Sequence, residues 1–77
     1  MERHNGTHYE INIYTNTNGQ QLTDRRTATN KRDALRIAKE QAGLFPFVEV
    51  LRQYTYNGDY VAFDVVAEYL NGEILNN

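Results

Sequence analysis

Four of the five glycines in this 77-residue chain directly follow an asparagine. They form the pairs Asn5-Gly6, Asn18-Gly19, Asn57-Gly58 and Asn71-Gly72. An Asn-Gly pair between hydrophobic runs favours a type I′ turn, because both central residues of that turn need a positive φ, which glycine adopts freely and asparagine tolerates. The pairs therefore predict repeated antiparallel reversals and a sheet built from hairpins.

The apolar pattern between these turns predicts the order strand, strand, helix, strand, strand. Tyr9, Ile11 and Ile13 alternate with polar residues, which is typical of a strand with one buried face. After a turn at residues 16–19, residues 20–28 hold few apolar side chains. We therefore expect a polar second strand at an edge of the sheet.

A single helix is expected from Lys31 to Ala42. Asn30 can cap its N-terminus together with Asp33, and Gly43 stands where a left-handed C-terminal cap belongs. The apolar residues at helical spacing, which should face the sheet, are Ala34, Leu35, Ile37, Ala38 and Ala42. These elements predict an α+β fold, in which one helix packs on one face of an antiparallel sheet of four to five strands.

A two-residue turn at Asn57-Gly58 determines the predicted register of the second hairpin. On one face it pairs Tyr54 with Val61, Arg52 with Phe63, Val50 with Val65 and Val48 with Ala67. That face is almost wholly apolar, whereas a register one residue away would bury the carboxylates of Asp64 and Glu68. We expect the guanidinium of Arg52 to reach water or a carboxylate at the rim of the sheet.

Residues 1–77 are expected to form one small domain, with residues 1–7 and 76–77 flexible. A short fifth strand after Asn71-Gly72 should place Ile74 beside Tyr69. The chain has no cysteine, which fits a reducing compartment, and no apolar run of signal-peptide or membrane-spanning length. We therefore expect a cytoplasmic protein, in the host cell if a phage encodes it, that does not enter a membrane.

Positive charge is concentrated in one segment. Residues 25–39 hold six basic residues against one acidic residue, a net charge of +5, whereas residues 40–77 hold one basic residue against six acidic residues, a net charge of −5. Such a basic segment is typical of contacts with a phosphate backbone. The candidate nucleic-acid-binding residues are Arg25, Arg26, Lys31, Arg32 and Arg36. The alternative is a solvated helix face, because Arg36 has ion-pair spacing with Asp33 and Glu40.

Tyrosines and carboxylates of the second hairpin form the other candidate surface. Exposed tyrosine is enriched at protein interfaces and also stacks on nucleic-acid bases. The candidate partner-binding residues are Tyr56, Asp59, Tyr60, Asp64 and Glu68, whose carboxylates would engage a basic surface and imitate phosphates. The alternative is ordinary cross-strand pairing, such as Tyr60 near Thr55.

Little in the sequence indicates catalysis. Serine and cysteine are absent, so the commonest covalent nucleophiles are missing. His4 and His8 would share a face only in a helix, which Gly6 disfavours, so we expect no metal site. A catalytic pairing of Asp64 with Glu68 would need a cleft that a chain of this length barely provides. We expect no catalytic residue, no cofactor and no small-molecule substrate.

One run of motifs carries a family resemblance. The segment from Arg36 to Gln41 ends a lone helix and is followed by Val48-Glu49-Val50, an Asn57-Gly58 turn and Tyr60-Val61-Ala62. In topology and hydrophobic pattern this part of the chain resembles certain small phage-borne anti-CRISPR proteins, including inhibitors of type I surveillance complexes. The resemblance implies a compact, non-enzymatic protein that occupies the nucleic-acid path or a subunit surface of a nucleoprotein complex.

The sequence therefore favours a protein-interaction module as the function. The resemblance specifies an inhibitor from a phage or mobile element that acts by steric and electrostatic occlusion, with a CRISPR–Cas effector subunit as its protein partner. The second hypothesis is direct nucleic-acid binding by the basic segment from Arg25 to Lys39.

Overall fold

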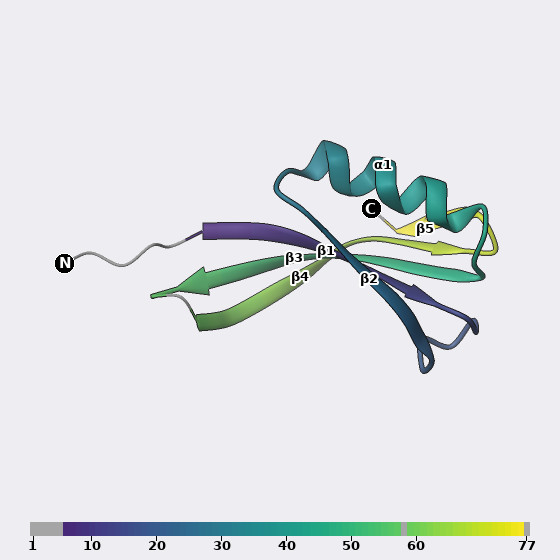
Figure 1. The fold of residues 1–77 in the computed structure, drawn as a ribbon, viewed down its shortest axis with the longest axis horizontal. Coiled ribbons are helices and arrows are strands. Elements are labelled where there is room, and N and C mark those ends of the chain that lie inside the picture. The colour runs from purple at the N-terminus through teal and green to yellow at the C-terminus, as the bar shows by residue number, and fades with distance from the viewer. Residues whose placement is uncertain (1–5, 58, 77) are drawn as a thin grey trace.

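The structure is a computed structural model that describes residues 6–57 and 59–76, without the side chains of residues 60, 61 and 76. Its elements are β1 (Gly6–Tyr14), β2 (Leu22–Ala28), α1 (Lys31–Ala42), β3 (Phe47–Tyr56), β4 (Asp59–Leu70) and β5 (Glu73–Asn76). The strands form one antiparallel sheet in the order β2-β1-β3-β4-β5, with α1 on one face (Figure 1). The predicted α+β fold and the predicted edge position of the second strand are confirmed.

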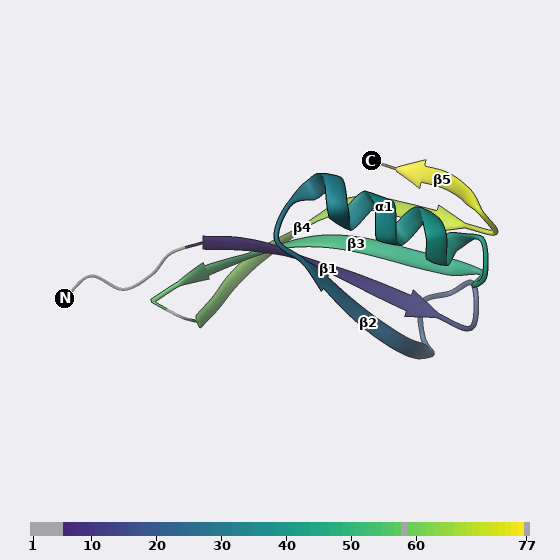
Figure 2. The same ribbon diagram turned by 45° about the horizontal axis from the view of Figure 1, so that its top comes forward.

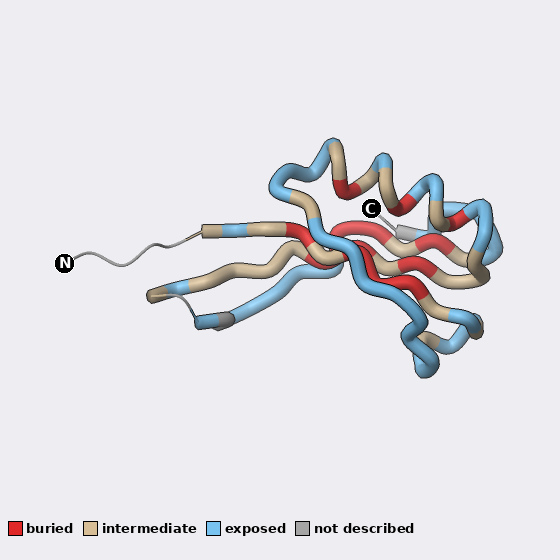
Figure 3. Tube along the Cα trace, in the orientation of Figure 1, coloured by how far each residue is buried: buried red, intermediate tan, exposed pale blue. Residues whose placement is uncertain are grey.

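The core lies between α1 and the part of the sheet beneath it. Ala34, Ala38 and Ala42 are buried on the inner face of α1, and their small side chains let the helix approach the strands closely. Leu35 and Ile37 pack beside them and are partly buried. The largest fully buried side chains of the sheet are Ile11, Ile13, Val48 and Val50. Figure 3 shows this burial concentrated in the half of the sheet that α1 covers.

The helix begins as its sequence predicts and ends differently. The side chain of Asn30 accepts a hydrogen bond of 2.8 Å from the backbone N–H of Asp33, so the predicted cap is confirmed. The prediction of a left-handed Gly43 is wrong, because this residue has a right-handed φ of −76°. The terminal carbonyl groups are satisfied by a tight turn instead, in which the N–H groups of Leu44 and Phe45 both donate to the carbonyl of Gln41 at 2.9 Å.

The Asn-Gly pairs differ in how they turn the chain. Asn71 and Gly72 have φ values of 51° and 87°, as a type I′ turn requires, and they join β4 to β5. In the loop between β1 and β2, Gly19 has a φ of 74°. Asn57 at the end of β3 has a φ of 55°, while Gly58 lies outside the described residues, as does Asn5. The fifth strand pairs Ile74 with Tyr69, which confirms that predicted contact.

The predicted register of the β3–β4 hairpin is correct beside the turn and wrong farther away. Thr55 pairs with Tyr60 as expected, but β4 then carries two bulges, which leave residues 61 and 66 without a partner of their own. Beyond the second bulge Val50 pairs with Ala67 instead of Val65. A bulge adds one residue to one strand and reverses the alternation of side chains beyond it. Phe63 and Val65, which we expected in the core, are therefore 59% and 42% exposed.

The sheet extends beyond the helix as a single layer. We call this part the arm; it comprises residues 6–8 of β1, 51–56 of β3 and 59–65 of β4 (Figures 1 and 2). Residues 6 and 7, which we expected to be flexible, begin β1, and residue 76, for which we expected the same, ends β5. The rest of the predicted flexible N-terminal segment, and residue 77, lie outside the described residues.

Candidate interaction face

The face of the sheet opposite α1, called the open face below, carries a chain of polar contacts. Strand residues alternate between faces. Ile11 and Val48 point to the helix, so their neighbours Asn12 and Glu49 point away from it. Asn12 is only 5% exposed although no helix covers it, because long side chains of the neighbouring strands surround it.

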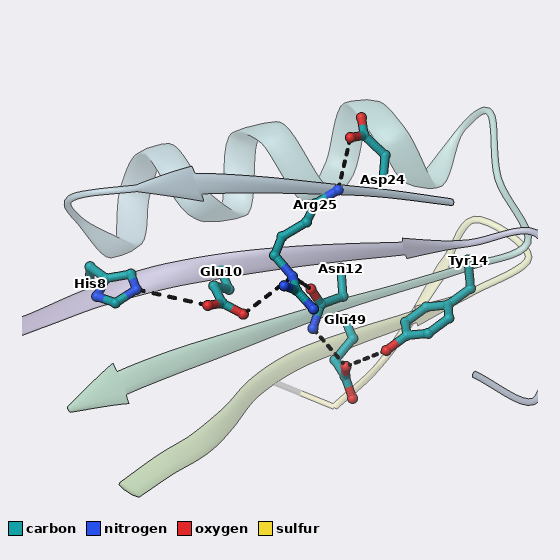
Figure 4. A network of polar contacts seen from close by, with 7 residues as sticks. All are labelled: His8, Glu10, Asn12, Tyr14, Asp24, Arg25 and Glu49. Atoms are coloured by element: carbon teal, nitrogen blue, oxygen red, sulfur yellow. Dashed lines mark hydrogen bonds and ion pairs between the residues drawn. The ribbon is translucent and has the colours of Figure 1, made fainter. Parts of the chain in front are cut away.

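Figure 4 shows the contacts that bury Asn12. Its amide nitrogen donates to Oε1 of Glu49 at 3.3 Å, and its amide oxygen accepts a hydrogen bond of 3.0 Å from Nε of Arg25. The hydroxyl of Tyr14 also donates to Oε1 of Glu49, at 3.0 Å. Arg25 lies 3.7 Å from a carboxylate oxygen of Glu10. These contacts link β2, β1 and β3 and hold the side chains in fixed positions.

The environment of Tyr14 favours its neutral form. Partial burial is the largest cause that raises the pKa of its phenol, followed by the hydrogen bond to Glu49 and the negative charge of that carboxylate. Arg25 opposes this shift. Tyr14 therefore acts as a hydrogen-bond donor at neutral pH, and its ring also packs on Phe47, with centroids 5.3 Å apart.

Next to this network, the β3–β4 ladder forms a row of pairs on the open face. In order along the strands, the pairs are Gln53 with Phe63, Leu51 with Val65, Glu49 with Glu68, and Phe47 with Leu70. An acidic pair thus lies between two apolar pairs. Glu49 and Glu68 are thus directly opposite each other in the ladder, an arrangement that is unfavourable for like charges.

The predicted tyrosine and carboxylate surface is divided by the bulge at residue 66. Glu68 lies on the open face, whereas Asp64 pairs with Arg52 on the helix side and accepts a hydrogen bond of 2.7 Å from the hydroxyl of Tyr54. Asp59 and Tyr56 form the pair nearest the turn, and both are exposed. The side chain of Tyr60 lies outside the described residues. Asp64 and Glu68 therefore do not share one surface.

Arg52 lies on the helix side of the arm, where we expected it. Its guanidinium carbon is 5.6 Å from the ring centroid of Tyr54, within the range of a cation–π contact. Its Nε is buried and has no hydrogen-bond partner among the described residues. The hydrogen bond to Asp64 is the main cause that raises the pKa of Tyr54.

The predicted basic residues do not form one surface either. Arg25 belongs to the open face, whereas Arg26 lies on the other side of β2 with its Nε 2.9 Å from Oδ2 of Asp24. This contact lowers the pKa of Asp24. Arg36 lies within ion-pair distance of Asp33 and Glu40, at 3.9 Å and 3.7 Å, as the alternative hypothesis of a solvated face expects. Lys31 and Arg32 are exposed at the start of α1.

Several residues of the open face were absent from the predicted sites. The predicted register places Phe63 and Val65 in the core, and it gives Glu49 no role beyond its place in a strand. The alternation of side chains along β3 is a usable signal for Glu49, because it places this residue on the face of the sheet opposite to the one that buries Val48 and Val50. For Phe63 and Val65 the bulge removes any such local signal.

Other features offer less to a ligand. A shallow depression lies between the end of α1 and the β4–β5 turn, lined by residues 42–46, 71 and 72. Within the described residues, no three acidic or histidine side chains are placed to hold a metal ion, and His4 lies outside them. No described helix combines the length and the apolarity that a membrane crossing needs. Comparison with known proteins finds no matching family model, no matching curated protein and no matching solved structure.

Proposed function

We propose that this chain is a small, non-enzymatic protein-interaction module that binds its partner through the open face. The observation that carries the proposal is the uncovered face itself, where exposed Phe63 and Val65 adjoin a network that holds Arg25 and Tyr14 in place. Exposed apolar surface rimmed by polar groups marks interaction sites in small proteins. Arginine and tyrosine are also enriched among residues that contribute most to binding.

The more specific proposal is inhibition of a nucleoprotein complex by occlusion, as the anti-CRISPR resemblance implies. A single-layer arm can enter a groove that a thicker domain cannot, and Glu49 and Glu68 offer carboxylates in place of phosphates. The test is the target-DNA binding of purified type I surveillance complexes with and without the protein. Unchanged DNA binding across these complexes would contradict this specific form and leave the general one.

The general proposal is tested by capture of partners with two matched variants. The double variant Phe63→Ser/Val65→Ser changes the open face, and Tyr56→Ser changes an equally exposed aromatic residue near the end of the arm. We expect the immobilised wild type and the Tyr56 variant to retain the same partner from a cell extract and the double variant to lose it. Retention by the double variant would contradict binding through the open face. Circular dichroism checks that all three proteins are folded.

Direct nucleic-acid binding is the second candidate, and exposed Lys31 and Arg32 at the entrance of α1 favour it. Their neighbours Arg26 and Arg36 already have carboxylate partners, which weakens the case for a continuous basic surface. The test is the affinity for labelled single- and double-stranded DNA and RNA at about 50 and 200 mM salt. Tight binding that weakens steeply with salt, and that Lys31→Gln/Arg32→Gln abolishes, would support this candidate over the first.

A further inference from the structure

We infer that the partner contributes a cationic amphipathic helix, whose basic side chain lies between Glu49 and Glu68 and whose apolar side chains cover the pairs on both sides. This inference rests on the proposed function, because it names the chemistry of the partner at the open face. The evidence is the order apolar, acidic, apolar along the β3–β4 row.

The charge of the open face indicates that the partner is positively charged. The described open face holds four carboxylates, those of Glu10, Glu49, Glu68 and Glu73, against the single guanidinium of Arg25. That guanidinium lies 3.7 Å from Glu10, while the side-chain donors that Glu49 has in the described part of the chain are the neutral groups of Asn12 and Tyr14. A cation from a partner would therefore find two carboxylates, those of Glu49 and Glu68, that no cation of the described residues pairs with.

Spacing favours a helix with a regular pattern. Phe47, Glu49 and Leu51 are two residues apart on β3, so successive side chains of the row lie about 7 Å apart. A helix rises about 1.5 Å per residue, so residues i, i+4 and i+8 are about 6 Å apart along its axis. A partner helix with an apolar residue, a lysine or arginine, and another apolar residue at these positions matches the row.

The other face of the same sheet is already covered by a helix with this spacing. There, α1 packs through Ala34, Ala38 and Ala42, which have the same i, i+4, i+8 spacing. A helix on the open face would complete a three-layer arrangement of helix, sheet and helix. The α1 helix of a second copy does not fit the row, because its exposed residues supply charge without apolar anchors; they are Lys31, Arg32, Arg36, Lys39 and Glu40.

The experiment uses synthetic helical peptides as defined probes. One is an amphipathic leucine and lysine peptide, the second replaces each lysine with glutamate, and the third scrambles the first so that the helix has no apolar face. Fluorescence anisotropy measures their binding to the wild-type protein, to Glu49→Gln/Glu68→Gln and to Glu40→Gln/Asp59→Asn. The last variant loses the same amount of charge from exposed positions off the open face.

We expect the cationic amphipathic peptide to bind at least about tenfold more tightly than either control peptide. We also expect Glu49→Gln/Glu68→Gln to weaken it by about tenfold or more and Glu40→Gln/Asp59→Asn to leave it unchanged. Equal weakening by both double variants would overturn the inference, since net charge alone would then explain binding. No binding at about 1 mM peptide would overturn it as well.

Two further readouts separate this inference from the proposed function. If a captured partner is lost with Phe63→Ser/Val65→Ser but kept with Glu49→Gln/Glu68→Gln, the interaction module stands and the cationic helix is excluded. If sedimentation shows a dimer that Phe63→Ser/Val65→Ser dissociates, a second copy occupies the face and the inference is wrong.

Discussion

Asn12 shows how a single polar residue organises the open face. It is the one polar side chain among the described residues that is buried, and its amide satisfies both of its roles, as donor to Glu49 and as acceptor from Arg25. A buried polar group that keeps its partners contributes modestly to stability, whereas removing one partner leaves the others unsatisfied. The Asn12 side chain is therefore more important for stability than its small size suggests.

Asn12→Ala should lower the free energy of unfolding by about 1–3 kcal/mol, because it removes a hydrogen bond from each of two charged side chains. Urea denaturation followed by circular dichroism measures this change. Thr27→Ala, at an exposed position of the same face, is the control and should change stability by less than about 0.5 kcal/mol. A comparable loss in both variants would mean that the network has no special role.

Glu49→Gln should lower the pKa of Tyr14 towards its ordinary value, because it removes the negative charge that helps to raise it. The pKa of Tyr69, which burial raises on the other face, should stay the same. An NMR titration of the tyrosine rings above pH 9 measures both. No change at Tyr14 would show that burial alone causes its shift.

The sign of the pH dependence follows from the same shift. A tyrosine whose pKa is higher in the folded state binds its proton more tightly there, so its contribution to stability is complete below the ordinary pKa of 10.0 and is lost as the pH rises through the folded value. The wild type should therefore lose stability above about pH 10. Glu49→Gln should lose less over the same range.

At the scale of elements, two glycines predicted to be alike have opposite backbone conformations. Gly72 has a φ of 87° in the β4–β5 turn, where a side chain is strained, whereas Gly43 has a right-handed φ of −76°. A Cβ on Gly43 would lie 3.6 Å from the carbonyl oxygen of Glu40, an ordinary contact. The turn residue needs glycine, and the residue after the helix does not.

Gly43→Ala should raise the free energy of unfolding by about 0.4–1 kcal/mol, because alanine restricts the unfolded chain and fits the native conformation. Gly72→Ala should lower it by about 1 kcal/mol or more, because alanine is strained at positive φ. Thermal denaturation measures both changes, each kcal/mol being about 4–8 °C for a domain of this size. Destabilisation by Gly43→Ala would contradict the right-handed geometry.

Elements defined by local signals could be predicted from the sequence, and those that depend on distant packing could not. The cap at Asn30, the bounds of α1 and the core strand through Ile11 all have nearby determinants. The predicted β3–β4 register depends on counting from the turn, and a bulge has no comparable local signature because its position depends on how the strand packs in the whole sheet. Of the candidate site, Arg25 and Glu68 were identified, but the bulge separated Glu68 from Asp64.

At the scale of the whole molecule, stability and binding surface are unevenly distributed. The half of the sheet beneath α1 holds the core cluster of buried residues, whereas the described part of the arm is a single layer in which Leu51 is the buried residue of β3 (Figure 3). Backbone groups with few apolar neighbours open more readily than those in a packed core. A partner on the open face would supply the missing layer.

Amide hydrogen exchange should therefore divide the sheet into two parts. We expect residues 51–56 and 59–65 to exchange about tenfold or more faster than the amides of Ile11, Val48 and Ala67. Mass spectrometry of peptic fragments or NMR measures the rates. Uniform protection along β3 and β4 would contradict the division, and a bound partner should slow exchange in the arm.

The unpaired residue at position 66 acts as a phase shift in β4. On the C-terminal side of it Ala67 and Tyr69 face the helix, and on the N-terminal side, as far as the bulge at residue 61, Phe63 and Val65 face away from the helix. A scan of β4 for tolerance to polar substitution should thus show two periodic patterns out of step with each other. The core lies on one side of residue 66 and the arm on the other. Insertion or loss of one residue in the arm part of β4 would therefore exchange the side chains between the two faces of the arm and leave the pairing in the core in place.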